Sequence, residues 1–311
     1  MTGKTMRQVF GEELCLWGEQ MDSLVVLDAD VSSSTQTKLF GLRYPQRFFN
    51  FGIAEANMVS AAAGMAACGL VPVVSTFAFL LTLRAGDPVH SLIAYNKLNV
   101  KLAGGYAGLS DFADGASHQS VMDLAIMRAL PNMTVLVPSD AETTRGAVKA
   151  MLRHEGPVYL RLSRDLAESL HQGEETFEIG KAKILKEGGD VTLVVSGTLL
   201  SQALRAAQLL EKKGIHASVL EYPVLKPFDR ETLKTFAERT GRIITLEEHS
   251  IIGGLGGAVA ECLGEAAPCP MVRLGVQDSF GESGAYNALL QRYGLTADHV
   301  ADAAEALVRG R

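Results

Sequence analysis

One carboxylate stands in a segment that otherwise holds mostly apolar and small residues. Glu55 lies within Phe-Phe-Asn-Phe-Gly-Ile-Ala-Glu-Ala-Asn (residues 48–57), and the small-residue run that follows is suited to a buried helix. Burial penalises the charged form of an acid, so an acid at the start of such a helix needs a partner. Acids in such environments are candidates for function. The alternative is an ordinary glutamate favoured by the helix dipole.

A second polar pair, Asp114 and His118, lies in a loop whose neighbouring residues are Gly, Ala and Ser. A carboxylate and an imidazole have little packing reason to stand there. The pair is therefore a candidate for function. The plain alternative is a histidine in a turn beside an aspartate that stabilises that turn.

Composition excludes several classes of protein. The 311 residues are enough for two domains, and 47% apolar residues with only 6% aromatics favour α/β layers. The longest apolar stretch, residues 69–83, is interrupted by Pro72 and is too short to span a bilayer. Since the N-terminus also lacks the apolar core of a signal peptide, we expect a cytoplasmic protein. A net charge of −6 without a basic stripe argues against a nucleic-acid partner. The four cysteines have no CxxC spacing, so no metal site is predicted in this chain.

Hydrophobic patterning predicts strands alternating with helices, and therefore mainly parallel sheets, in both halves. The predicted strands are residues 24–27, 71–75, 100–103, 134–137 and 158–161, then 190–195, 217–222, 242–246 and 270–274. The predicted helices are residues 7–20, 57–68, 88–98 and 200–213, with others starting at Ser120 and at Ser139, where Glu142 gives a capping-box spacing. We predict two three-layer α/β domains, residues 1–165 and 183–311, joined by a polar linker at 166–182. Ligands of such sheets gather at the carboxyl ends of the strands, where Asp30, Phe77 and residues 161–164 are expected.

The second half offers fewer candidate residues. Its glycine run, residues 253–257, follows an acidic patch and is not a GxGxxG motif. We interpret it as a tight turn into a helix, and nothing in this half suggests catalysis.

Eight short segments, taken in their order along the chain, match the motifs of one enzyme family. They are Leu-Asp-Ala-Asp (27–30), Gly-Ile-Ala-Glu-Ala-Asn (52–57), Ser-Thr-Phe (75–77), Asp-Gly-Ala-Ser-His-Gln (114–119), Pro-Asn-Met (131–133), Val-Pro-Ser-Asp (137–140), Leu-Ser-Arg (162–164) and Glu-Glu-His-Ser (247–250). Together they resemble the C-terminal half of transketolases, which consists of the pyrimidine-binding domain and the C-terminal domain. The resemblance covers practically the whole chain.

The resemblance implies a thiamine diphosphate cofactor and a role for each candidate. Glu55 would be the catalytic carboxyl that hydrogen-bonds the pyrimidine N1′ and promotes the imino form of the cofactor. Phe77 would stack on the pyrimidine ring, and Asp30 would lie near the cofactor. Without the resemblance, Phe77 could be a core aromatic and Asp30 could cap a turn.

The resemblance also implies a substrate site. His118 would be a hydrogen-bonding or proton-transfer partner at the reacting end of the cofactor, and Asp114 would bind substrate hydroxyls. The terminal phosphate of the substrate would meet Arg7, Ser34, Tyr106 and Arg164. Arginine suits phosphate geometry, but Arg7 and Ser34 are placed by spacing alone, and Arg7 could equally be a solvated helix residue.

One expected motif is missing from the chain. Enzymes of this kind hold Mg²⁺ and the diphosphate with a Gly-Asp-Gly motif and a later Asn, and no Gly-Asp-Gly occurs here. We therefore expect a separate N-terminal subunit that carries the motif and holds the metal and diphosphate, in an α2β2-like assembly. Met1 lies so close to the first helix that this domain is not expected upstream.

Three departures from the family pattern concern the substrate. Tyr106 stands where many transketolases carry a histidine, Phe112-Ala113 replaces Gly-Glu, and Leu80 and Gly86 replace aromatic residues. They favour a sugar whose end group differs in size or charge from that of ordinary pentose phosphates.

The expected function is transfer of a two-carbon ketol unit from a ketose, in the simplest case a phosphorylated one, to an aldose. Other enzymes with this architecture remain open: a β-subunit of a 2-oxoacid dehydrogenase, or a ligase like deoxyxylulose-phosphate synthase. A regulatory subunit that keeps the fold without turnover is the alternative from another class.

Overall fold

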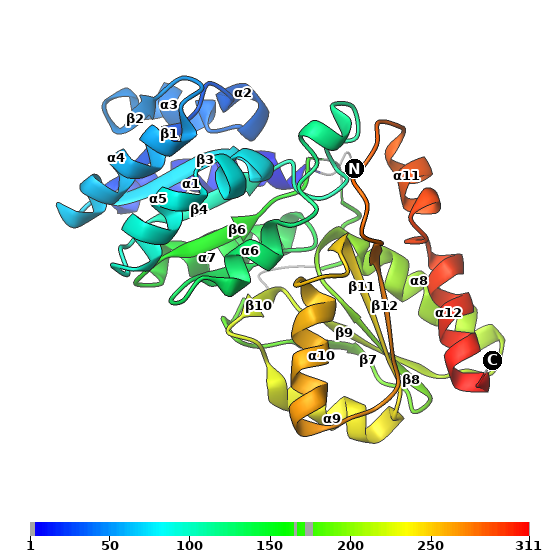
Figure 1. The fold of residues 1–311 in the computed structure, drawn as a ribbon. Helices are drawn as coiled ribbons and strands as arrows, with labels where there is room; N and C mark the ends of the chain where they lie inside the picture. The colour runs from blue at the N-terminus through cyan, green and yellow to red at the C-terminus, as the bar shows by residue number, and fades with distance from the viewer. Residues whose placement is uncertain (1–3, 165–166, 172–176, 311) are drawn as a thin grey trace.

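The computed structural model describes residues 4–164, 167–171 and 177–310, and it contains two α/β units, each built on its own sheet (Figure 1). The predicted linker, residues 166–182, falls partly outside the described residues. The predicted fold class, two α/β domains with mainly parallel sheets, is confirmed.

The first sheet has seven strands in the order β10-β5-β6-β4-β3-β1-β2. Six are parallel strands of the first half: β1 Leu24–Asp28, β2 Phe48–Asn50, β3 Val71–Phe77, β4 Lys101–Gly105, β5 Thr134–Leu136 and β6 Val158–Arg161. The central strands are buried along almost their whole length, as expected for a parallel sheet with both faces covered. The seventh, β10 Val224–Lys226, comes from the second half and pairs antiparallel with β5. The sequence did not predict this strand.

Helices of the first half cover both faces of that sheet. They are α1 Met6–Gln20, α2 Ser32–Thr35, α3 Lys38–Arg43, α4 Glu55–Ala67, α5 Gly86–Pro88, α6 Asp123–Ala129 and α7 Ala141–Arg153, with short 3₁₀ turns at Pro45–Arg47 and Gly115–Ser117. π-helical turns at Leu80–Arg84 (η2) and Val89–Ala94 (η3) flank α5. The helix predicted over 88–98 therefore begins earlier and ends earlier.

Two predicted helix starts were wrong. The helix expected from Ser120 begins at Asp123. The cap of α7 is Asp140, whose carboxylate accepts the Thr143 amide at 2.9 Å and forms a capping box with Thr143. The Ser139 hydroxyl instead donates to Glu221 of the second half at 2.5 Å.

The second sheet has five strands in the order β12-β11-β8-β9-β7. They are β7 Lys183–Lys186, β8 Val191–Val195, β9 Ala217–Glu221, β11 Ile243–Ser250 and β12 Met271–Val276, all parallel except the edge strand β7. Helices α8 Leu200–Lys212, α9 Arg230–Thr240, α10 Leu255–Ala266, α11 Tyr286–Arg292 and α12 Ala297–Arg309 accompany it, with a 3₁₀ turn at Gly197–Leu199. The glycine run does turn into a helix: Gly253 has a φ of +80°, and α10 begins two residues later.

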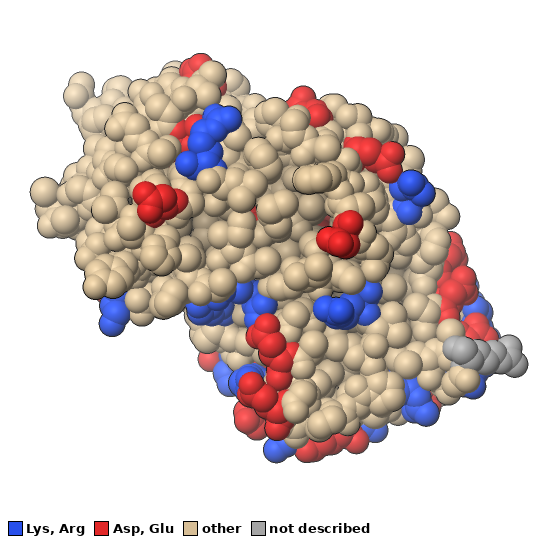
Figure 2. Space-filling model, viewed as in Figure 1, with Lys and Arg blue, Asp and Glu red and all other residues tan. Residues whose placement is uncertain are grey.

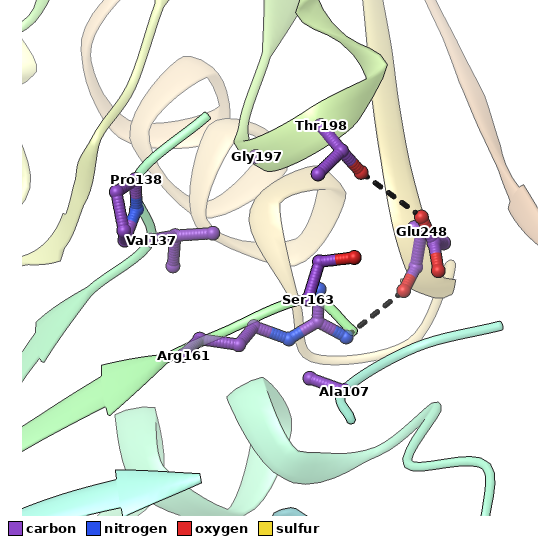
Figure 3. A pocket seen from close by; sticks show the side chains of 8 residues that line it. All are labelled: Ala107, Val137, Pro138, Arg161, Ser163, Gly197, Thr198 and Glu248. Carbon is purple, nitrogen blue, oxygen red and sulfur yellow. Dashed lines mark hydrogen bonds between the residues drawn. The ribbon is translucent and has the colours of Figure 1, made fainter. Parts of the chain in front are cut away.

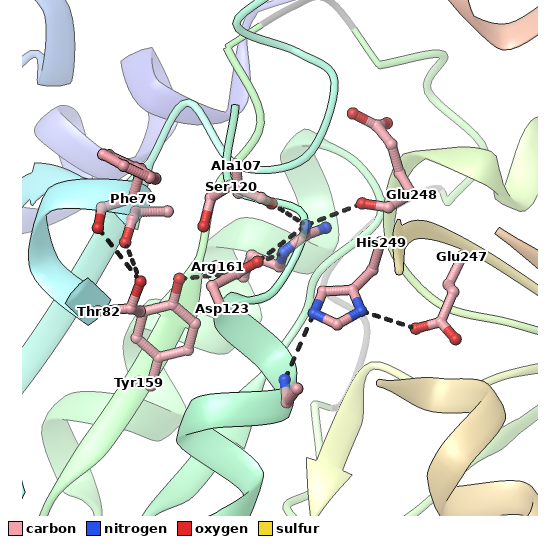
Figure 4. A network of polar contacts seen from close by, with 12 residues as sticks. Phe79, Thr82, Ala107, Ser120, Asp123, Tyr159, Arg161, Glu247, Glu248 and His249 are labelled. Atoms are coloured by element: carbon pink, nitrogen blue, oxygen red, sulfur yellow. Dashed lines mark hydrogen bonds and ion pairs between the residues drawn. The ribbon is translucent and has the colours of Figure 1, made fainter. Parts of the chain in front are cut away.

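A buried polar network joins the two halves (Figure 4). Arg161, at the end of β6, holds the Asp123 carboxylate through Nε (2.8 Å) and Nη2 (3.2 Å). The same Nη2 donates to the carbonyl oxygen of Glu248, in β11, at 2.9 Å. The Tyr159 hydroxyl also donates to the Asp123 carboxylate, at 2.7 Å. The guanidinium therefore ties the first sheet to the second.

The surface differs between the halves. On the face drawn in Figure 2, charged side chains gather over the C-terminal half and are sparse over the first half. None of the helices in the described part of the chain is long and apolar enough to cross a membrane.

Candidate active site

The site is built at the carboxyl ends of neighbouring parallel strands, as expected for sheets of this kind. Phe77 is the last residue of β3, and Tyr106 directly follows β4, which pairs with β3. Their rings lie 4.5 Å apart between centroids, tilted by 34°. Tyr106 adopts a left-handed backbone with a φ of +57°, which is uncommon outside glycine and marks a constrained position.

Two arginines meet at Tyr106. Arg7, from α1, donates through Nη1 to the Tyr106 hydroxyl and to the Ser34 carbonyl oxygen, both at 2.9 Å. The Arg164 guanidinium lies over the Tyr106 ring, 5.0 Å from its centroid. The fold thus brings together the four residues predicted to meet the substrate's end group, although Ser34 takes part through its carbonyl group.

His118 lies at the other side of Phe77. Its ring approaches Phe77 edge-on with centroids 6.1 Å apart, and its Nδ1 is 2.9 Å from the Ser117 hydroxyl. Asp114, on the same loop, is exposed. The predicted pair therefore sits beside the aromatic cluster.

The second half positions this loop, a role that the sequence did not reveal. The Gly284 amide donates to the Phe112 carbonyl oxygen at 3.1 Å. Gln119 Nε2 donates to the Glu282 carbonyl oxygen, also at 3.1 Å. The segment just before α11 therefore braces the loop that carries Asp114 and His118.

Glu55 is the first residue of α4 and is only 1% exposed. Arg84, at the end of η2, pairs with it: Arg84 Nη1 lies 3.1 and 3.0 Å from the two carboxylate oxygens. The Arg84 side chain is 51% exposed. The sequence analysis missed this partner, although Arg84 is the only Lys or Arg between residues 48 and 96.

Asp30 is placed in a turn. It has a φ of +64°, its amide donates to Asn50 Oδ1 at 3.0 Å, and its carboxylate accepts from Asn50 Nδ2 at 3.1 Å. These contacts match the turn-capping alternative, so its role at a cofactor stays a prediction.

Asp111 is a second residue that the sequence analysis missed. It is completely buried, and its Oδ1 accepts from Arg164 Nη1 at 3.2 Å. Burial, together with the neighbouring Asp114 carboxyl, raises the pKa of Asp111 to about 7 against the attraction of Arg164.

A small cavity at the junction of the halves is a packing feature. It is lined by Ala107, Val137, Pro138, Arg161, Ser163, Gly197, Thr198 and Glu248 (Figure 3). Its volume of about 10 Å³ admits no more than a water-sized molecule. It therefore cannot hold a sugar.

Comparisons with known proteins agree with the geometry. Residues 2–169 match the model of the transketolase pyrimidine-binding domain, and residues 180–300 match the transketolase C-terminal domain. The chain belongs to the transketolase family. It corresponds to the C-terminal section of such an enzyme.

Relatives of similar length support the same placement. A Methanocaldococcus jannaschii protein assigned as a transketolase C-terminal section is 44% identical over 96% of this chain and 94% of its own length. A 6-deoxy-6-sulfo-D-fructose transketolase subunit of Clostridium sp. (strain MSTE9) is 42% identical, over 96% of this chain and 93% of its own length. A solved structure described as a split gene transketolase, inactive β4 tetramer, superposes with a TM-score of 0.92 at 48% identity and covers 99% of both chains.

The residues present fit the pyrimidine of the thiamine diphosphate that transketolases use. Glu55, which is 1% exposed, begins a helix, and its carboxylate pairs with Arg84, whose side chain is half exposed. Phe77 offers an aromatic ring at a strand end.

Proposed function

We propose that this chain is the C-terminal subunit of a two-chain, thiamine-diphosphate-dependent transketolase. The enzyme transfers a two-carbon ketol unit from a ketose to an aldose. The observation that carries the proposal is Glu55, a buried carboxylate at the start of α4 whose partner, Arg84, is half exposed. A buried carboxylate needs a polar partner, and a partner that is half exposed leaves room for a ligand to take its place.

Glu55 would hold the cofactor's pyrimidine by a hydrogen bond to N1′, and Phe77 would stack on the ring. Thiamine diphosphate supplies the carbanion chemistry when bound. The task of Glu55 is to hold a proton at its carboxyl oxygen, for which Arg84 must withdraw from it. Since about half of the Arg84 side chain already faces solvent, withdrawal costs little burial.

His118 and Asp114 would orient the sugar. His118 sits against the edge of Phe77 and can exchange a proton with a substrate hydroxyl or carbonyl oxygen. Asp114 can accept hydrogen bonds from sugar hydroxyls. The loop between them is held by the segment before α11, so the second half contributes to catalysis through positioning.

The far end of the sugar would meet Arg7, Tyr106 and Arg164. Two guanidinium groups on one phenol make an anion site. The Clostridium relative is named for a sulfonated sugar, so the anionic end group to consider is a sulfonate as well as a phosphate.

A second subunit would complete the site. This sequence contains no Gly-Asp-Gly, so the partner would hold Mg²⁺ and the diphosphate. Beside Glu55 and Arg84 in the chain stand exposed apolar side chains, with Ile53 76% and Leu83 45% exposed. Such a surface suits a protein partner. The related β4 tetramer is described as inactive, which supports an α2β2 assembly as the active form.

The test is reconstitution. This chain and an N-terminal-type transketolase subunit carrying Gly-Asp-Gly, encoded beside it, are purified and assayed alone and together with thiamine diphosphate and Mg²⁺. The panel contains phosphorylated, sulfonated and unsubstituted ketoses as well as 2-oxoacids. Ketol transfer only in the mixture is the expected result. Turnover of a 2-oxoacid instead, or a complex that binds the cofactor without any turnover, would overturn the proposal.

A further inference from the structure

The charge at the substrate's end-group site is not set by its arginines alone. Arg7 and Arg164 bring two positive charges to Tyr106. Asp111 lies directly behind Arg164, with its Oδ1 3.2 Å from Nη1, and none of its surface is exposed. An ionised Asp111 therefore offsets one of the two arginine charges. The other nearby carboxylate, Asp114, is exposed, so solvent screens its charge more strongly.

Asp111 is unlike a carboxylate that serves only to fix an arginine. Its second oxygen, Oδ2, receives no hydrogen bond from an N–H or hydroxyl group among the described residues, and the Asp114 carboxyl lies beside Asp111. Buried carboxylate oxygens are normally satisfied, since leaving one bare is costly. Arg7 also has an unsatisfied group: its buried Nε has no hydrogen-bond partner in the described part of the chain. Both unsatisfied groups belong to the cluster around Tyr106.

We propose that Asp111 is a specificity-determining residue of the end-group site, an inference that rests on the proposed function. Asp111 adapts the site to a sugar whose end group has a single negative charge, such as a sulfonate. It disfavours a phosphate dianion. A monoanion is balanced by the remaining positive charge. A dianion would bring its second charge against the buried carboxylate, which solvent screens poorly.

The charge of Asp111 itself depends on its surroundings. The charged groups that face it are Asp114 on the same loop and Arg164 on the segment after β6. Burial and Asp114 raise the pKa of Asp111 to about 7. Lowering the pH from 8 to 6 therefore neutralises the Asp111 carboxylate. The positive charge of Arg164 is then no longer offset.

The experiment is calorimetric binding to the full chain at pH 8, without turnover. The two ligands are 2,3-dihydroxypropane-1-sulfonate, a monoanion, and glycerol 3-phosphate, a dianion because its second pKa is about 6. In the wild type, the charge of Asp111 is expected to weaken binding of the phosphate dianion more than binding of the sulfonate. Asp111→Asn should raise the affinity for the phosphate about tenfold and that for the sulfonate no more than about threefold, because the removed charge acts twice as strongly on a dianion.

Asp22→Asn is the matched control. Asp22 is exposed, between α1 and β1, so the substitution makes the same change in net charge far from Tyr106. It should leave both affinities unchanged. An equal gain in Asp22→Asn and Asp111→Asn would overturn the proposal, as would a change in Asp111→Asn that is the same for both ligands.

A pH series on the wild type needs no substitution and remains decisive if Asp111→Asn does not fold. The sulfonate does not titrate between pH 6 and pH 8, so its affinity should rise by up to about threefold, as in Asp111→Asn, when the pH falls through about 7. This rise should be absent in Asp111→Asn. A flat profile in the wild type overturns the proposal, and so does failure of both ligands to bind. These outcomes involve no turnover, so they are independent of the ketol-transfer assay.

Discussion

Two carboxylate–arginine pairs in this chain have nearly the same chemistry and different surroundings. In the junction pair, Asp123 and Arg161 are 0% and 9% exposed, and further hydrogen bonds reach Tyr159 and the Glu248 carbonyl oxygen. In the site pair, Glu55 is as buried as Asp123, but its partner Arg84 is 51% exposed. One pair is closed on all sides, while the other is open on the arginine side.

The difference agrees with the roles that we propose: a structural ion pair at the junction and a replaceable one at Glu55. Burial works to raise the pKa of Asp123, but the Arg161 charge and hydrogen bonds outweigh it and hold that pKa below its usual range. Such a pair is fixed, because removing either partner leaves a buried charge uncompensated. The Arg84 partner of Glu55 is half exposed, so we expect that a ligand could replace it without disturbing the junction.

The largest expected effect is on activity. Glu55→Gln removes the carboxyl that would hold the proton and should lower ketol transfer by the reconstituted enzyme about 10²- to 10⁴-fold. The melting temperature of the chain should stay nearly unchanged. Steady-state kinetics and thermal unfolding measure the two effects, with Glu19→Gln on the exposed side of α1 as the control. Undiminished turnover would remove Glu55 from the mechanism.

The next effect is on stability. Arg161→Met leaves Asp123 buried without its guanidinium and should lower the free energy of unfolding by about 3–5 kcal/mol, measured by urea denaturation. The double variant Arg161→Met/Asp123→Leu should recover part of the loss because no lone charge remains. A loss below about 1 kcal/mol in the single variant would contradict the structural role of the junction pair.

A third prediction concerns pH. His171 lies between Asp140 of the first half and Glu221 of the second, 2.9 and 3.0 Å away. Burial works to lower the pKa of His171, but these carboxylates raise it to about 10. Since the unfolded value is about 6.5, this stabilisation is complete below pH 6.5 and is lost as the pH rises toward 10.

His171→Ala should therefore cost about 3 kcal/mol of unfolding free energy near pH 6. The difference from wild type should shrink as the pH approaches 10. Urea denaturation at several pH values measures it. A difference that does not change with pH would mean that His171 stabilises the junction by packing and not by charge.

The smallest effect is expected for Arg84→Gln. Because Arg84 is half exposed, its removal should let water reach the Glu55 carboxylate, which also lies at the amino end of α4. The unfolding free energy should therefore fall by no more than about 1 kcal/mol. Side-by-side denaturation with Arg161→Met gives the comparison directly. A loss as large as that of Arg161→Met would show that both pairs are structural.

The sequence by itself determined the alternation of strands and helices and the residues with unusual chemistry. Buried parallel strands are continuous apolar runs, so β1, β3, β4 and β6 could be located from composition. Glu55 and the pair Asp114 and His118 stood out because polar groups had no local reason to be there.

Only the tertiary structure decided which of these groups meet. Arg7 lies 99 residues from Tyr106 and Arg84 lies 29 residues from Glu55, and neither separation follows a helical or strand period. The loop of His118 is braced by Glu282, 163 residues beyond Gln119. Local sequence patterns indicate burial and backbone geometry, because both depend on residues that are neighbours in the chain. The charge of a site depends on which side chains the packed sheets bring within a few ångströms, and here that made Arg84 and Asp111 part of the site.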